Sequence, residues 1–126
     1  MLKSIMRVVI GIQGVLALFV AANAFTNPEK LAAQLGLSMN GELGLSTFRG
    51  DIGSLFAVAG LFMIGAALGS NRTYLVPPLL MTSIALALRA ATALQVGFRS
   101  EFTQPMAVEG VTVLLLLLGH ASFARK

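Results

Sequence analysis

The sequence predicts an all-α fold: an integral membrane up-down four-helix bundle with a short interfacial helix between spans one and two. Of the 126 residues, 56% are hydrophobic and only 11% are charged, with a mean hydropathy of +0.85, whereas a soluble domain has about 25% charged residues. Four apolar segments each have about 20 residues, the length that a helix needs to cross a bilayer. No long run alternates between polar and apolar residues, which argues against membrane-spanning strands. Residues 1–126 therefore make one four-span transmembrane domain.

The first predicted span has a rival interpretation. Lys3 and Arg7 precede its apolar run, and Ala22-Asn23-Ala24 matches the small-residue cleavage site of a secretory signal. We expect a retained span rather than a cleaved signal. The predicted spans run from Ile5 to Phe25, from Ser46 to Leu68, from Tyr74 to Leu94 and from Pro105 to Phe123.

A two-turn helix is predicted directly after the first span. Asn27 is a good N-cap and Pro28 a good first helical residue, while Gly36 suits the helix end. Leu31 and Leu35 lie one helical turn apart and give the helix an apolar side. This pattern is typical of a helix that lies at the membrane interface.

The remaining connections are predicted to be loops. The segment from Ser38 to Leu45 contains two glycines, Gly69 to Thr73 joins spans two and three, and Gln95 to Gln104 joins spans three and four. Short links make consecutive helices antiparallel neighbours, so an up-down bundle is the simplest arrangement.

The distribution of lysine and arginine predicts the orientation, because cytoplasmic loops carry the excess of these residues. The other side of the membrane has Lys30 and Arg99, with Arg49 near a span end. We therefore predict a multi-pass protein of the bacterial inner membrane with both termini in the cytoplasm. The basic residues on the side of the termini are Lys3, Arg7, Arg72, Arg125 and Lys126.

Two arginines and two carboxylates fall inside the predicted spans toward the side opposite the termini: Arg49, Asp51, Arg89 and Glu109. Such groups are costly in hydrocarbon and usually face a partner or a polar cavity. By the predicted topology, all four lie about 5–10 Å below the outer interface. Two positive and two negative charges balance, so we predict one buried network from three helices, which Asn23 of the first span could join.

Three interpretations of this cluster stay open. The charges could clamp the helices together, they could line a pocket for a polar ligand, or the arginines could snorkel to the interface or serve a proton relay. Gly50, Gly53, Ala57 and Gly60 keep span two slim beside the charges, which permits either close helix contact or space for a ligand.

Several other site types are not expected. The chain has no cysteine, and its one histidine, His120, lies far from the carboxylates along the predicted spans, so no metal site is expected. No nucleotide-binding, zinc or serine-hydrolase motif is present, and the sequence leaves the cofactor unknown. The basic residues stand at span ends rather than in a stripe, so we expect no nucleic-acid partner despite the net charge of +4. Gln13 is interpreted as an interhelical hydrogen-bonding residue.

Several short motifs are spread along the chain: Asn27-Pro28, Leu35-Gly36-Leu37, Leu43-Gly44-Leu45, Arg49-Gly50-Asp51-Ile52-Gly53, Gly60-Leu61-Phe62, Arg89 and Glu109. By these motifs, the whole chain resembles the small bacterial four-span proteins of domain-of-unknown-function family 4345, which is itself similar to the DoxX-like membrane proteins. This chain departs from the family pattern with Gly50 where alanine is usual, with Ser54 where a second glycine is common, and with Val96-Gly97 where an acidic residue often precedes glycine. The last departure points to Glu109 as the partner of Arg89. The resemblance implies the four-span fold and no established activity.

We expect a small binding or accessory membrane protein with an anionic or amphipathic ligand. Arg49 and Arg89 would contact ligand oxygens, while Asp51 and Glu109 would hold the arginines. Its expected partners are the lipid bilayer, a lipophilic or anionic small molecule, and a membrane protein or a second copy.

Two alternatives remain, and whether the chain is an enzyme stays open. One is a membrane enzyme acting on a lipophilic substrate, with Glu109 or Asp51 as acid or base beside the arginines. The other is a subunit of a quinone-linked redox complex, which only the DoxX-like analogy suggests.

Overall fold

The computed structural model describes residues 1–123, and the predicted basic residues Arg125 and Lys126 lie outside the described residues. The described residues are helical apart from short turns. The prediction of an all-helical multi-pass chain is confirmed. Four helices are long and apolar enough to cross a membrane: Leu2–Thr26, Gly41–Gly69, Arg72–Val96 and Ser100–Phe123.

The second span begins earlier than predicted. The segment from Ser38 to Leu45 was expected to be a loop, but helix starts at Gly41 and continues without a break to Gly69. Asn40 has the extended backbone of an N-cap, and Glu42 in the first turn suits the positive end of the helix dipole. The first half of the chain consists of α1 (Leu2–Thr26), α2 (Pro28–Gln34), α3 (Gly41–Thr47), the π-helical segment η1 (Phe48–Ile52) and α4 (Gly53–Gly69).

A tight turn joins the two halves of the chain. Ser70 ends α4 in the left-handed conformation, with φ of 51°. The Asn71 side chain then accepts a hydrogen bond of 3.0 Å from the backbone N–H of Thr73, and two prolines in the first turn of α5 sit where missing N–H groups cost least. The second half consists of η2 (Arg72–Leu75), α5 (Val76–Val96), η3 (Ser100–Phe102) and α6 (Thr103–Phe123).

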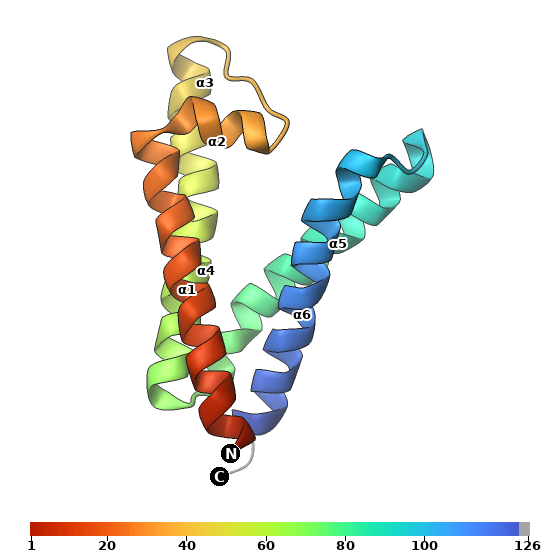
Figure 1. Ribbon diagram of the computed structural model, residues 1–126. Helices are drawn as coiled ribbons and strands as arrows, with labels where there is room; N and C mark the ends of the chain where they lie inside the picture. Colours follow the sequence, from red (N-terminus) through yellow and green to blue (C-terminus); the bar gives the residue numbers. More distant parts are fainter. Residues whose placement is uncertain (124–126) are drawn as a thin grey trace.

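The spanning helices form two antiparallel pairs, α1 with α4 and α5 with α6. The start of α1 and the end of α6 lie at one end of the molecule, where the two pairs pack together. At the opposite end, which we call the splayed end, the pairs diverge and α2 lies across the tip of the α1/α4 pair (Figure 1). The four helices do not pack together along their whole length, so the predicted up-down four-helix bundle is not confirmed.

The main apolar core explains why the pairs meet only at one end. It draws on α1, α4, η2 and α6, and it includes Ile10, Leu75, Leu116 and Phe123, each at most 1% exposed. Along α5 only Pro78 is buried, so the helix has no packing partner across the gap beyond its first turns. A second, smaller cluster of Ala24, Leu31, Ala32 and Phe48 fixes α2 against α1 and η1.

Within the first pair, α1 and α4 touch through their backbones. A Cβ atom at Gly60 would lie 2.7 Å from the carbonyl oxygen of Gly14, and a Cβ at Gly14 would lie 2.9 Å from that of Gly60. Only glycine permits this approach. Of the small residues predicted to keep span two slim, Gly60 thus serves close helix contact, as small residues do in membrane helix pairs.

Candidate functional site

Arg89 of α5 and Glu109 of α6 form the one ion pair among residues 1–123. Arg89 Nε lies 2.8 Å from Glu109 Oε1, which confirms Glu109 as the partner of Arg89. The side chains are 43% and 18% exposed, so the pair is only partly buried. Glu109 Oε1 is itself buried yet accepts no aligned hydrogen bond within the described residues, so the contact rests on charge and proximity.

The position of Glu109 follows from the face that α6 presents to α1. Glu109, Thr112, Leu116 and Gly119 recur every three or four residues, which places them on one face of the helix. The last two are buried in the core. Glu109 therefore lies one helical turn before Thr112, the residue of α6 that is hydrogen-bonded to α1. This places it at the base of the gap between the two pairs.

Gln13 of α1 and Thr112 of α6 make that hydrogen bond. Gln13 Nε2 donates a long hydrogen bond of 3.4 Å to Thr112 Oγ1, which confirms Gln13 as an interhelical contact. Gln13 Oε1 is buried and has no partner among the described groups. The base of the gap thus holds unused hydrogen-bond acceptors on Gln13 and Glu109.

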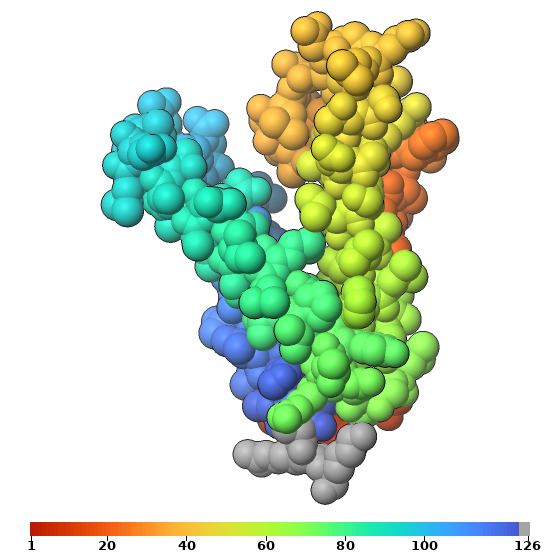
Figure 2. Space-filling model, turned by 180° about the vertical axis from the view of Figure 1, so that it is seen from behind, coloured from red at the N-terminus to blue at the C-terminus, as the bar shows by residue number. Residues whose placement is uncertain are grey.

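Arg89 lies on the face of α5 that continues from the core. Pro78, Met81, Ala85, Arg89 and Thr92 follow one another at three- and four-residue steps. Pro78 is buried and Met81 packs against the core, whereas Arg89 and Thr92 are exposed because the pairs have separated. Figure 2 shows the resulting open cleft between α5 and the first pair, seen from behind.

A small pocket borders Arg89. Its volume is about 180 Å³, and its lining comes from Leu88, Arg89 and Thr92 of α5 and from Phe102 of η3. Leu88 and Phe102 are its apolar lining residues, whereas Arg89 offers a guanidinium and Thr92 a hydroxyl. Sequence reasoning missed Thr92 and Phe102, although Thr92 stands three residues after Arg89 and so shares its face.

Arg49 belongs to a different part of the molecule. Its Nη2 donates a hydrogen bond of 2.9 Å to the carbonyl oxygen of Phe25, and its guanidinium carbon lies 4.3 Å from the centre of the Phe25 ring. Phe25 is in the last turn of α1, where carbonyl groups lack helical partners. Arg49 therefore ties the π-helical segment to the end of α1 through a hydrogen bond and a cation–π contact.

The predicted network of four charges is not formed. Asp51 is exposed in the same π-helical segment as Arg49, and Asn23 Nδ2 donates to the Phe19 carbonyl of its own helix at 2.9 Å. Arg49, Asp51 and Asn23 belong to η1 and α1, whereas Arg89 and Glu109 belong to α5 and α6, and the two helix pairs diverge (Figure 1). The expected contact among all four charges is therefore wrong, and only Arg89 and Glu109 pair among the described residues.

No cluster of three or more histidine, cysteine or carboxylate side chains among the described residues could hold a metal ion. The pocket at the end of α5 offers the Arg89 guanidinium, which Glu109 contacts, and the Thr92 hydroxyl beside the apolar side chains of Leu88 and Phe102. Such a surface can bind oxygen atoms and an apolar chain together.

Comparison with known proteins finds no matching family model, no matching curated protein and no matching solved structure.

Proposed function

We propose that this protein binds an amphipathic molecule in the cleft between its two helix pairs, with Arg89 contacting an anionic or carbonyl group of the ligand. The partly exposed Arg89–Glu109 pair beside an apolar pocket carries this proposal. The proposal keeps two of the predicted ligand contacts, Arg89 and Glu109. Arg49, Asp51 and Asn23 are not part of the proposed binding site and belong instead to the first helix pair.

Unused donors on Arg89 support a ligand contact. A guanidinium has five N–H groups, and Arg89 makes no hydrogen bond to another residue in the described part of the chain. An ionisable group at membrane depth normally faces a partner or a polar cavity. Glu109 holds the arginine at one nitrogen, and the remaining N–H groups suit phosphate, carboxylate or carbonyl oxygens.

The apolar part of the ligand would occupy the space between the pairs. The exposed Leu88 borders the pocket, and the half-buried Ala85 lies one helical turn before Arg89 on the same face of α5. A hydrocarbon chain beside them would take the place of the missing helix contacts, and so complete the four-helix bundle that the sequence predicts. The cleft opens at the splayed end, which suits an amphiphile entering from the adjacent leaflet.

The membrane arrangement is part of the proposal. We place the protein in the bacterial inner membrane with both termini in the cytoplasm, since basic residues predominate at the end with the termini. We place α2 along the opposite interface. Its Leu31 and Ala32 are buried against the protein while Glu29 and Lys30 are exposed, which is the side preference of an interfacial helix.

Native mass spectrometry from mild detergent tests the proposal, with bacterial polar lipid extract as the ligand source. We expect the wild-type chain to retain an amphiphile. The amount retained by Arg89→Gln should be at least tenfold lower. Arg99→Gln, which removes an exposed arginine outside the pocket near the same end, is the matched control and should retain the ligand.

Glu109→Gln then reports the ligand charge. Glutamine keeps an acceptor for Arg89 but removes a negative charge beside the ligand, so retention of an anionic ligand should rise and that of a neutral one should stay unchanged. Glu101→Gln on η3 is the control. An empty wild-type protein, combined with unfolding of Arg89→Gln, would identify the pair as a helix clamp and refute the binding function.

A further inference from the structure

A second groove lies on the outer side of the α1/α4 pair, near the end with the termini. Its volume is about 690 Å³. Small residues form its floor: a Cβ at Gly11 would lie only 3.6 Å from the Cβ of Ala67. The walls include Val8 and Leu68, which are 62% and 74% exposed, so the groove presents an apolar channel to the surroundings of the helix pair.

Arg7 stands at one end of this groove and is held in place by α4. Its Nε donates to the Ala67 carbonyl at 2.7 Å, and its Nη2 donates to the Leu68 carbonyl at 3.0 Å. These carbonyls lie in the last turn of α4, whose dipole favours a cation. Two of the five N–H groups are used in this way, and the side chain is exposed. A fixed guanidinium with free donors therefore borders an apolar channel.

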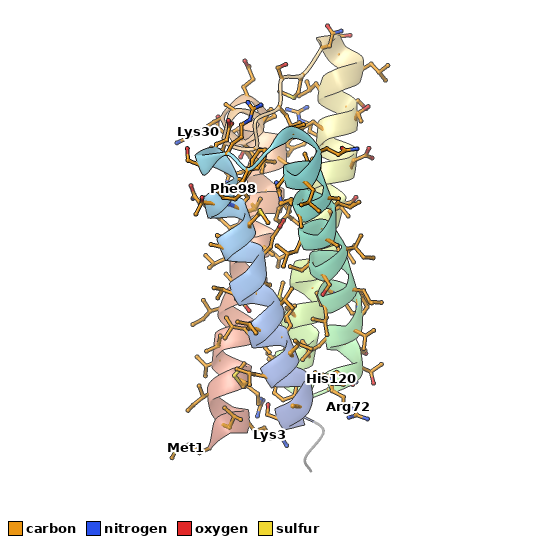
Figure 3. The ribbon with its side chains drawn as sticks, turned by 90° about the vertical axis from the view of Figure 1, so that its right-hand side faces the viewer. Met1, Lys3, Lys30, Arg72, Phe98 and His120 are labelled. Carbon is orange, nitrogen blue, oxygen red and sulfur yellow. The ribbon has the colours of Figure 1, made fainter. Side chains whose placement is uncertain are left out.

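The end of the molecule that holds Arg7 carries basic side chains and no acidic ones among the described residues. All five carboxylates of the chain lie in the segments of the splayed end, in α2, α3, η1, η3 and the start of α6. Lys3 and Arg72 lie at the end of the molecule where α1 begins (Figure 3), and Arg7 follows Lys3 by one helical turn of α1. Basic residues that flank a spanning helix attract anionic lipid headgroups.

We propose that this groove binds an anionic phospholipid, with one acyl chain along Gly11 and Ala67 and the phosphate at Arg7. This site is independent of the cleft at Arg89, which lies at the opposite end. A two-fold dimer through the same groove is disfavoured, because it would bring Arg7 and Lys3 of one copy against the same cations of the other.

The test is lipid retention measured by native mass spectrometry after release from nanodiscs of equimolar phosphatidylglycerol and phosphatidylcholine. We expect phosphatidylglycerol to be retained over phosphatidylcholine about fivefold, the gain expected for one arginine at an anionic headgroup. Arg7→Gln should remove this preference. Arg72→Gln, an exposed arginine at the same end but outside the groove, should change it less than twofold.

A second variant keeps Arg7 and its bonds to α4 but fills the channel. Ser4→Trp places a large ring at a groove-lining position, and we expect it to remove the preference for phosphatidylglycerol as Arg7→Gln does. Leu114→Trp, on an exposed face of α6, should not. Equal retention of the two lipids by the wild type, or equal effects of Arg7→Gln and Arg72→Gln, would overturn the proposal. A dimer that Ser4→Trp dissociates would assign the groove to a second copy instead.

Discussion

The crossing of α1 and α4 makes Gly60 a sensitive position, and Gly60→Ala is the sharpest test of the fold. The added Cβ would lie 2.7 Å from the Gly14 carbonyl oxygen and 2.9 Å from Leu18 Cγ, whereas ordinary contact begins at 3.4 Å. The first of these neighbours is backbone and cannot rotate away. The helices must therefore separate by about 0.7 Å at their closest point.

The expected cost is that of overpacking, about 1–3 kcal/mol. Alanine gains about 0.5–1 kcal/mol over glycine within a helix, so the net destabilisation of Gly60→Ala is about 0–2.5 kcal/mol. Gly110→Ala on α6 is the matched control, because nothing lies within 4 Å of its added Cβ. That variant has the same propensity gain without the clash, and should be stabilised by about 0.5–1 kcal/mol.

Unfolding by sodium dodecyl sulfate in mixed micelles measures both variants. The cysteine-free chain allows two dyes to be attached at introduced cysteines, so the loss of energy transfer reports separation of the helices. The difference between the two variants isolates the packing cost, since both gain the same helix propensity. A Gly60→Ala protein as stable as Gly110→Ala would refute the close backbone crossing.

Two further substitutions test the turn and the base of the cleft in the same unfolding assay. Ser70→Gly should stabilise the protein by about 1 kcal/mol, because glycine adopts the left-handed φ of 51° without the strain that serine bears there; a loss of stability would show that the buried hydroxyl has a role. Gln13→Met should change the free energy of unfolding by less than about 1 kcal/mol, since a single interhelical hydrogen bond in a membrane averages about 0.6 kcal/mol and the long bond to Thr112 leaves Oε1 without a partner. A loss above about 2 kcal/mol would indicate that Gln13 has a partner beyond Thr112.

The helices were predictable because their causes are local. About 20 consecutive apolar residues cannot be solvated as a loop and must satisfy their backbone groups as a helix in lipid. The short helix after the first span was predictable from Asn27, Pro28 and Gly36, and it runs from Pro28 to Gln34 with Gly36 in the left-handed region. The start of the second span was missed because the two glycines indicated a loop, whereas the structure begins a helix after Asn40 with Glu42 in its first turn.

The sequence by itself determined the four long apolar helices, because these depend on residue type and on distance along the chain. The resemblance to the four-span family pointed to the pairing of Arg89 with Glu109, whose charged atoms lie 2.8 Å apart. The tertiary structure alone decided that the two helix pairs diverge and that Arg49 bonds to the end of α1 instead of to Glu109. The physical reason is that helix contact depends on side chains from distant segments. Gly14 and Gly60 permit a close first pair, while α5 beyond Pro78 buries nothing that would close the gap.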